Sequence, residues 1–243
     1  MDKKSILEAI KIAKEVSKKR NFKQGFDLVI NLKNLNLKKP EENLLLFTQL
    51  NHPIPNKKTK IAAFVDYDLE KQAKETCDLV ILKDEFPKYE VKKRELKKIG
   101  RAYDYFIAQA EIMPKVATLA GRILGPIGKM PNPKVGGVVP GNLPTIKPII
   151  ERLKLTIKLQ TKGELTIKTS VGNEEMKDED IADNVLSLYN FVLHSLPQEK
   201  NNILSVLIKL SMGSPVEIGK EYKKEEIEII TQKSKPKKDA SEP

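Results

Sequence analysis

The sequence is poor in the residues that build disulfides, metal sites and membrane spans. Its 243 residues include one cysteine, Cys77, two histidines, His52 and His194, and no tryptophan. A single thiol cannot form a disulfide within the chain, and this set is too small for a structural zinc site. No apolar run approaches the ~20 residues that cross a bilayer. We therefore expect a cytoplasmic protein with no membrane partner, no metal and no cofactor.

Acidic residues are also in short supply. Lys and Arg number 44 against 33 Asp and Glu, for a formal net charge of +11, while 40% hydrophobic residues are enough to form cores. At roughly 150 residues per domain, the length predicts two modest domains. The net charge is +5 over residues 1–55, +8 over residues 56–154 and −2 over residues 155–243. The positive excess is thus concentrated in the middle of the chain.

Residues 112–150 contain no acidic residue at all. This segment carries five Lys or Arg, six of the twelve glycines and seven of the fifteen prolines. A flexible linker rich in Gly and Pro would also be rich in Ser or acid, and would lack apolar residues such as Ile123, Leu124 and Val138. The composition predicts an ordered loop system with a basic surface.

The periodicity of the first part of the chain is typical of an α+β domain. Ser5 and Glu8 form a capping-box pattern ahead of apolar residues at helical spacing, which predicts an amphipathic helix. Residues 26–32 alternate between apolar and other side chains, as a half-buried strand requires, and residues 44–50 are a second strand candidate. His52-Pro53-Ile54-Pro55 interrupts regular structure, so we place a domain boundary there.

The pattern changes after this boundary. Three continuous apolar runs, at residues 61–65, 79–82 and 103–107, are separated by helical segments at residues 69–75 and 90–99. Continuous strands with intervening helices predict a parallel sheet that is covered on both faces. The middle of the chain is therefore predicted to be a Rossmann-like domain.

From residue 155 onward, apolar and polar side chains alternate again. Residues 155–159 and 165–167 flank Lys162-Gly163 and predict a β-hairpin. Asp178 is predicted to cap a helix, and residues 203–210 are predicted to form a further strand. Like the first 55 residues, these segments combine alternating strands with an amphipathic helix, so we expect them to complete the same domain.

Together these patterns predict two domains of the α/β and α+β classes. Residues 1–55 plus 155–230 form a discontinuous antiparallel α+β domain, because an insertion is tolerated best in an exposed loop. Residues 56–154 form the Rossmann-like parallel α/β insert. Residues 231–243 are polar and are expected to be a disordered tail.

No pattern of catalytic residues is present. Gly128-Lys129 resembles the end of a phosphate-binding loop, but Ile123 stands where that loop needs its first glycine and Met130 where it needs a hydroxyl. Asp66-Tyr67-Asp68 after the first apolar run would repel the pyrophosphate of a dinucleotide. We therefore predict that the chain is not an enzyme, and a nucleotide-using enzyme is the less favoured alternative.

Two short motifs point to nucleic acid. Gly125-Pro126-Ile127-Gly128 matches the Gly-x-x-Gly loop of KH domains, so a free-standing KH-like RNA-binding regulator is a further alternative. Ser211-Met212-Gly213 follows a predicted strand and is either a plain turn or a contact for a ribose or base. Clusters of Lys and Arg suit phosphate neutralisation, although we interpret the basic helix at residues 90–99 as a solvated face.

One region resembles the signature of a known family. Gly121-Arg122-Ile123-Leu124-Gly125-Pro126, then Gly128, then Met130-Pro131-Asn132-Pro133-Lys134, is similar to the signature of the large-subunit ribosomal protein L-one family, in its archaeal form. The resemblance extends to residues 19–32, to Leu50-Asn51-His52-Pro53 and to the strand that ends in Ser211. It implies a split α+β domain with a Rossmann-like insert, which agrees with the periodicity.

The resemblance implies RNA-binding residues in the split domain and a signature loop in the insert. This chain has Ser211 where relatives commonly have Thr, and Asn21 where a basic residue is common, so no contact is assigned to Asn21. His52-Pro53 replaces the more usual His-Gly. The residues implied to bind rRNA and mRNA are Phe22, Lys23, Lys168, Ser211, Met212 and Gly213. The signature loop comprises Gly125, Pro126, Gly128, Lys129, Met130, Pro131, Asn132, Pro133 and Lys134.

The resemblance also implies the partners of the chain. They are the large-subunit rRNA of the ribosomal stalk, the exit-site tRNA and the chain's own mRNA, and the protein is expected to be monomeric when free. The implied function is that of a structural rRNA-binding protein of the large ribosomal subunit. It would form the mobile stalk that assists release of deacylated tRNA, and would repress translation of its own mRNA.

Overall fold

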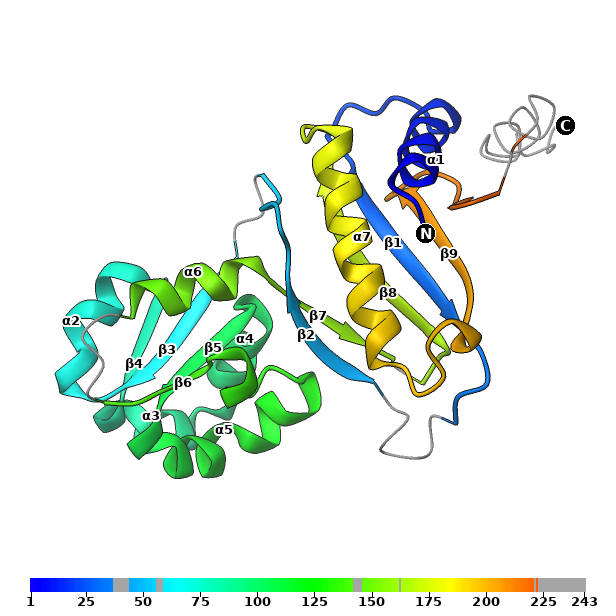
Figure 1. The fold of residues 1–243 in the computed structure, drawn as a ribbon. Helices are drawn as coiled ribbons and strands as arrows, with labels where there is room; N and C mark the ends of the chain where they lie inside the picture. The colour runs from blue at the N-terminus through cyan, green and yellow to red at the C-terminus, as the bar shows by residue number, and fades with distance from the viewer. Residues whose placement is uncertain (37–43, 56–58, 142–145, 162, 221, 223–243) are drawn as a thin grey trace, which may run out of the picture. The chain divides into compact units, whose positions relative to one another are not determined.

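The computed structural model describes residues 1–36, 44–55, 59–141, 146–161, 163–220 and 222 (Figure 1). The chain divides into two compact units, Met1–Asn56 with Ile157–Pro243 (unit 1) and Lys57–Thr156 (unit 2). The divisions predicted from the sequence follow residues 55 and 154, and the predicted tail at residues 231–243 lies outside the described residues. Helices accompany an antiparallel sheet in unit 1 and a parallel sheet in unit 2, which confirms the predicted fold class.

Unit 1 is built on a four-stranded antiparallel sheet with the strand order β10-β9-β1-β8. Every second side chain of β1 is buried, because helices α1 and α7 cover one face of the sheet (Figure 1). The elements of unit 1 are α1 (Lys3–Val16), β1 (Gly25–Leu32), β2 (Leu45–Gln49), β7 (Thr156–Gln160), β8 (Thr166–Asn173), α7 (Asp178–Ser195), the 3-10 helix Glu199–Asn202, β9 (Ile203–Leu210) and β10 (Val216–Glu217).

The core of unit 1 lies between this sheet and its two helices. Ile6 and Ile10 of α1, Leu28 of β1, and Val185 and Leu188 of α7 are all at most 1% exposed. Burying an aliphatic side chain of this size stabilises the fold by about 1.5–3 kcal/mol. The apolar residues that alternate along residues 26–32 therefore pack against those that recur at helical spacing near the N-terminus, and both sets belong to one core.

Three local predictions in unit 1 are wrong. Helix α7 has Lys177 as its N-cap, so Asp178 is the first residue of the helix and does not cap it. Helix α1 has Asp2 as its N-cap, so Ser5 lies inside the helix and forms no capping box. The hairpin predicted around Lys162-Gly163 does not form, because β7 pairs with β2 while β8 pairs with β1. Leu44 and Thr161, 117 positions apart, exchange hydrogen bonds of 3.2 and 3.1 Å next to the β2–β7 pair. Alternation shows which face a strand buries, but it does not select a distant partner strand.

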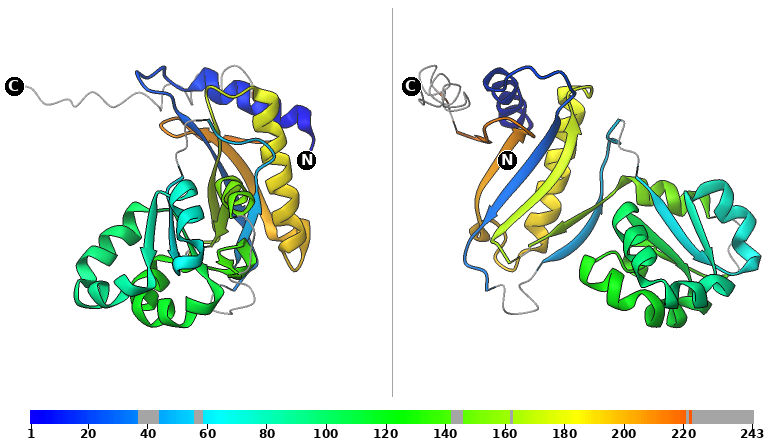
Figure 2. Two further views of the ribbon diagram at one scale, coloured as in Figure 1. Left: turned by 90° about the vertical axis from the view of Figure 1, so that its left-hand side faces the viewer. Right: turned by 180° about the vertical axis from the view of Figure 1, so that it is seen from behind.

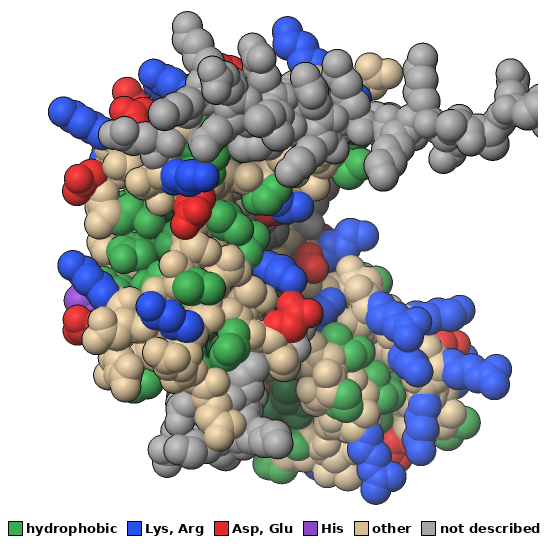
Figure 3. Space-filling model, turned by 90° about the vertical axis from the view of Figure 1, so that its right-hand side faces the viewer, with side chains coloured by type: hydrophobic (Ala, Val, Ile, Leu, Met, Phe, Trp, Pro, Cys, Tyr) green, Lys and Arg blue, Asp and Glu red, His purple; other side chains and the backbone are tan. Residues whose placement is uncertain are grey.

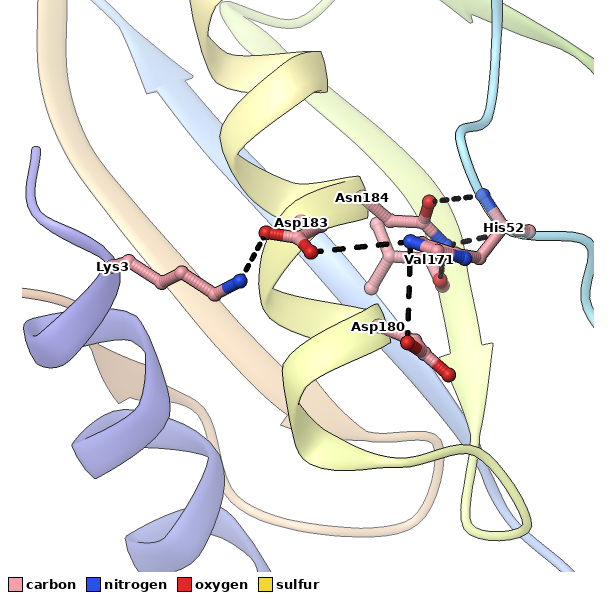
Figure 4. Close-up of polar contacts among 6 residues, drawn as sticks. All are labelled: Lys3, His52, Val171, Asp180, Asp183 and Asn184. Atoms are coloured by element: carbon pink, nitrogen blue, oxygen red, sulfur yellow. Dashed lines mark hydrogen bonds and ion pairs between the residues drawn. The ribbon is translucent and has the colours of Figure 1, made fainter.

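The segment around His52, which leads out of unit 1, is hydrogen-bonded to α7 through the buried side-chain amide of Asn184 (Figure 4). The Asn184 Oδ1 accepts a hydrogen bond from the His52 N–H at 2.9 Å, and its Nδ2 donates to the carbonyl oxygens of His52 at 3.1 Å and Val171 at 3.0 Å. The His52 imidazole lies 3.9 Å from the carboxylates of Asp180 and Asp183. The break predicted at His52 is therefore a fixed part of unit 1.

Unit 2 is a parallel sheet with the strand order β4-β3-β5-β6 and with helices on both faces. All five residues of β3 are buried and alternate between two cores. Phe64 packs in one core with Leu96 of α4, and Val65 packs in the other with Leu69 of α2. The elements of unit 2 are β3 (Ile61–Val65), α2 (Tyr67–Thr76), β4 (Leu79–Leu82), α3 (Phe86–Val91), α4 (Lys93–Ala102), β5 (Tyr105–Gln109), α5 (Met113–Ile127), β6 (Val138–Val139) and α6 (Lys147–Leu155), with 3-10 helices at Lys83–Glu85, Ala110–Ile112 and Pro133–Val135.

An acidic side chain, Asp66, lies at the carboxyl edge of the parallel sheet of unit 2. Asp66 follows β3 and caps α2, where its carboxylate accepts a hydrogen bond from the Tyr67 N–H at 2.9 Å. Lys83 donates to the same carboxylate at 2.8 Å, and these two hydrogen bonds hold the pKa of Asp66 below its usual value. In nucleotide-binding α/β domains a phosphate occupies this helix terminus. An internal carboxylate in that place does not fit this mode of nucleotide binding.

Cys77 is half-buried at the C-terminal end of α2, and burial raises the pKa of its thiol, which makes the thiol a poor nucleophile. Within the described ranges, no three side chains are arranged as metal ligands. Among the same residues, no helix has the length and apolar character of a membrane span.

The predicted signature loop is only partly a loop. Gly125 and Pro126 lie in α5, as does Gly121, which corrects the prediction of an irregular segment here. Helix α5 accommodates Pro126 because the proline lies in its last turn, close to the point where the hydrogen-bond ladder ends. Gly128 ends the helix with a left-handed φ of 70°, and its N–H donates to the Gly125 carbonyl oxygen at 2.8 Å.

The rest of the signature folds back onto unit 2. Met130 packs against the core formed by α3, α4 and α5, and Pro131 is buried. Asn132 caps the following 3-10 helix by accepting a hydrogen bond from the Lys134 N–H at 2.9 Å. The carbonyl oxygen of Asn132 also accepts from Gly137 N–H at 2.9 Å. These contacts build the fold of unit 2.

Lys129 ties the end of α5 to the end of α4. Its Nζ donates to the carbonyl oxygen of Tyr103, the C-cap of α4, at 2.6 Å, and its charge complements the negative end of that helix. The Lys134 side chain is exposed, and no ion pair or hydrogen bond of its ammonium occurs among the described residues. The two signature lysines therefore have different surroundings.

We predict that Lys129→Met lowers the free energy of unfolding by about 1–2 kcal/mol, because it removes a hydrogen bond from a charged donor to a helix end. The control variant Lys134→Met is expected to change it by less than about 0.5 kcal/mol. Urea unfolding of the full chain, followed by circular dichroism, measures both. Equal effects of the two substitutions would show that the bond to Tyr103 adds no stability.

Candidate RNA-binding surface

The face of the unit 1 sheet that lies opposite α1 and α7 is left open by these helices (Figure 2), and most of the residues on it are polar. The strand registers align its side chains in rows that run across β8, β1 and β9. No helix covers this face in the part of the chain that the structure describes (Figure 2). The successive rows are Ser170, Asp27 and Lys209, then Lys168, Val29 and Leu207, then Thr166, Asn31 and Ser205.

A tight turn, Ser211-Met212-Gly213, follows β9 at one end of this face. The Ser211 N–H and Oγ donate to the Gly25 carbonyl oxygen at 2.9 and 3.1 Å, so the turn is bound to the start of β1. The Gly213 N–H donates to the Leu210 carbonyl oxygen at 2.8 Å. A Cβ at Gly213 would lie 3.1 Å from the Ser17 Oγ, which explains the need for glycine. The turn is therefore a rigid part of the sheet end.

The Gln24 side chain connects this turn to the segment before β1. Gln24 is 1% exposed, and its Oε1 accepts a hydrogen bond from the Met212 N–H at 3.2 Å. Its Nε2 donates to the Lys18 carbonyl oxygen at 3.3 Å and to the Glu174 Oε1 at 3.4 Å, while its own N–H donates to the Glu174 Oε2 at 2.9 Å. One buried amide thus joins three separate chain segments.

Two large apolar side chains are exposed beside this amide. Phe22 is 55% exposed and Met212 is 61% exposed, although both flank the buried Gln24. The Met212 backbone is held by the Gln24 amide, so little conformational entropy is lost when a ligand covers this side chain, and Phe22 lies two residues before Gln24 in the chain. An aromatic ring and a flat thioether next to backbone and hydroxyl groups suit an unpaired base and its ribose.

The row nearest the turn combines a carboxylate with an ammonium. Burial raises the pKa of the Asp27 carboxyl, while the Lys209 charge and the nearby Ser211 hydroxyl act in the opposite direction. The Lys209 Nζ also lies 3.5 Å from the Ser211 carbonyl oxygen. Because the two charges offset each other, this end of the sheet is better suited to contacts of shape and hydrogen bonding than to attraction of phosphate.

The two lysines predicted to bind RNA each have an acidic neighbour. Lys23 forms an ion pair with Glu175. Lys168 donates to the Glu164 Oε2 at 2.9 Å, and this hydrogen bond holds the pKa of Glu164 below its usual value. Both ammonium groups are well exposed, so such pairs add little to stability and can be exchanged for a phosphate.

The structure places five of the six predicted RNA-binding residues at the same end of the sheet. Phe22, Lys23 and Ser211-Met212-Gly213 meet where β1 begins and β9 ends. Lys168 lies on the open face opposite Val29, roughly 13 Å along β1 from its first residue at a rise of 3.3 Å per residue. The nine signature-loop residues all belong to unit 2 and are not part of this surface.

Sequence reasoning misses the residues that support this surface. Gln24 and Glu174 lie 150 positions apart, and a buried amide with a distant carboxylate partner leaves no periodic pattern. Asp27 and Lys209 could have been found from the sequence, because they occupy polar positions in strands that show clear alternation. Placing them in one row would also have required the order and register of the strands.

Comparison with known proteins identifies the family. The model of the "Ribosomal protein L1p/L10e family" matches residues 12–214. The "Large ribosomal subunit protein uL1" of Methanocaldococcus jannaschii is 41% identical over 224 residues, which cover 92% of this chain and 99% of the relative. Proteins of the same name from Methanothermococcus thermolithotrophicus and Pyrococcus horikoshii are 40% and 37% identical, over 90% and 89% of this chain and 100% and 96% of their own lengths.

These matches define a ribosomal protein of the archaeal type. The chain belongs to the ribosomal protein L1p/L10e family, which confirms the resemblance noted in the sequence. The split of the chain into an antiparallel unit and an inserted parallel unit is thus the architecture of a member of this family.

We predict that Gln24→Ala lowers the free energy of unfolding by about 1–3 kcal/mol, because it leaves the Met212 N–H and the Lys18 carbonyl oxygen without the side-chain amide, while the backbone hydrogen bond to Glu174 remains. Hydrogen exchange of the Met212 amide should become faster in the same variant. Gln198→Ala, at an exposed glutamine, is the control and should change neither quantity. Unchanged protection at Met212 would show that Gln24 does not fix the turn.

Proposed function

We propose that this chain is a structural rRNA-binding component of the large ribosomal subunit and that unit 1 provides most of its rRNA affinity. Family membership and relatives named as large-subunit proteins support the ribosomal role. The surface formed by Phe22, Lys23 and Ser211-Met212-Gly213, called the end patch below, supports the assignment to unit 1. The observation that carries it is the exposure of two large apolar side chains, Phe22 and Met212, with the Met212 backbone held by Gln24.

The chemistry of the end patch favours folded RNA over duplex RNA. Phe22 can stack on an unpaired base, and Met212 can cover the apolar face of a ribose or base. Because the Ser211 hydroxyl hydrogen is directed at the Gly25 carbonyl oxygen, its oxygen is available to accept a hydrogen bond from a 2′-hydroxyl. Such contacts recognise a local RNA shape.

We predict that Phe22→Ala and Met212→Ala each weaken binding to large-subunit rRNA by a factor of about 5–150, the value of about 1–3 kcal/mol for a lost stacking contact. Val91→Ala is the matched control, because Val91 is an apolar residue of unit 2 that is 86% exposed. Filter binding of the full chain at physiological salt measures all three. Equal losses in the three variants would contradict a specific end patch.

The same proposal includes a role in the mobile stalk that assists release of deacylated tRNA from the exit site. The division into two compact units supports this role, because the end patch belongs entirely to unit 1. Unit 2, with its larger positive charge, is then available for a second RNA. This arrangement needs no catalytic group and no cofactor.

The chain's own mRNA is proposed as an alternative ligand of the end patch, through which surplus protein represses its translation. A compact patch that reads local shape can accept any RNA element that reproduces that shape. An mRNA element lacks the more distant phosphate contacts of the rRNA site, so its affinity should be lower. The rRNA site would then be occupied first, and only surplus protein would bind the mRNA and repress its translation.

Competition between the two RNAs tests this part of the proposal. The mRNA should bind about 5–150 times more weakly than the rRNA, and Met212→Ala should weaken both. Val91→Ala should leave both affinities unchanged. A variant of the end patch that loses rRNA but keeps mRNA would show two separate sites and would refute the shared surface.

A further inference from the structure

Helix α4 (Lys93–Ala102) carries an unusual set of exposed cations. The side chains of five of its ten residues are basic and exposed, and none of them forms an ion pair with another described residue. The one acidic residue of the helix, Glu95, pairs with Lys92 just outside it at 3.2 Å. The five cations are Lys93, Arg94, Lys97, Lys98 and Arg101.

Helical geometry places all five cations on one side of α4. At about 100° per residue they fall within an arc of about 140°, and Glu95 lies outside this arc. The buried residues Leu96 and Gly100 also lie outside this arc. From Lys93 to Arg101 the cations extend over about 12 Å of helix. We call these five residues the α4 strip, and Figure 3 shows a dense group of Lys and Arg side chains on unit 2.

The helix under the α4 strip is firmly held. A Cβ at Gly100 would lie 3.0 Å from the Leu124 side chain, so glycine permits the close packing of α4 on α5. The Lys129 ammonium also holds the C-terminal end of the helix through the Tyr103 carbonyl oxygen at 2.6 Å. The strip is therefore presented on a rigid support, which lowers the ordering cost of binding.

The charges of the α4 strip oppose one another in the free protein. Lys93 and Lys97, Lys97 and Arg101, and Arg94 and Lys98 are spaced four residues apart, and each like-charged pair destabilises a helix by about 0.2–0.5 kcal/mol. Packing of Leu96 and Gly100 holds the helix together in spite of this repulsion. A polyanion bound along the strip would relieve the repulsion and release its own counterions.

We propose that the α4 strip binds the phosphate backbone of an RNA duplex, as a second RNA contact that is distinct from the end patch. The inference rests on the proposed function in that RNA is the partner. It also replaces our interpretation of the basic helix as a solvated face, because the five cations are unpaired and share one side.

The composition of the strip selects duplex RNA over single-stranded RNA. Proteins that bind single strands combine cations with exposed aromatic rings on which bases stack. The α4 strip has no aromatic residue, so it offers charge without a stacking surface. Duplex RNA presents two rows of phosphates and keeps its bases stacked inside, so cations along a rigid helix can bind it without reading its sequence.

Binding of the full chain to an RNA duplex of roughly 20 base pairs, across about 50–200 mM salt, tests the proposal. The variant R94Q/K98Q/R101Q should weaken binding at low salt by about tenfold or more and reduce the slope of log affinity against log salt by about 2–3. The control K71Q/K74Q/K154Q removes three exposed cations from α2 and α6, which pack on the other face of the sheet. This control variant should keep most of the affinity for the duplex and most of the slope of log affinity against log salt.

Two further measurements separate this proposal from the function proposed above. Met212→Ala should bind the duplex like the unmodified chain while it loses affinity for rRNA. A single strand of the same length should bind the α4 strip more weakly than the duplex. Equal losses in the two triple variants, or tighter binding of the single strand, would overturn the α4 assignment. Unaltered rRNA binding by Met212→Ala would instead refute the end patch and leave the α4 result standing.

Discussion

The buried amide of Gln24 is the contact on which the proposed RNA-binding surface depends. It binds the Met212 N–H, the Lys18 carbonyl oxygen and the Glu174 carboxylate, and so brings together a turn, a helix end and a strand end from distant parts of the chain. Because its polar atoms are satisfied, the amide can be buried without a large desolvation cost. The exposed Met212 then projects from a fixed turn, and the exposed Phe22 lies two residues before the amide in the chain.

The two units handle charge in different ways. In unit 1, Lys23 of the end patch is paired with Glu175, and Lys209 on the adjoining sheet face lies beside Asp27. On α4 of unit 2, five exposed cations form no ion pair with another described residue. The first arrangement suits recognition of shape, and the second suits attraction to phosphate, which weakens as salt rises. Lys129 differs from both, since its ammonium supports the fold of unit 2.

The sequence predicts the layers of this protein better than its connections. Continuous apolar runs identify the parallel strands of unit 2, and alternation identifies β1, because burial on two faces or on one leaves a direct trace in the order of residues. The hairpin predicted around Lys162-Gly163 is wrong, since β7 and β8 find their partners far away in the chain. The irregular segment predicted through Gly121 and Gly125 is helical, because packing of α5 outweighs the helix-breaking tendency of glycine and proline.

The sequence by itself determined the class of the chain: a basic protein with an antiparallel and a parallel sheet, and a signature that places it in its family. These properties reside in composition, local period and linear motif. Tertiary structure decided which side chains meet. It placed Ser211-Met212-Gly213 beside Gln24, directed Lys129 to a helix end and gathered the α4 strip on one side of a packed helix. Such contacts join residues far apart in sequence, so local pattern cannot specify them.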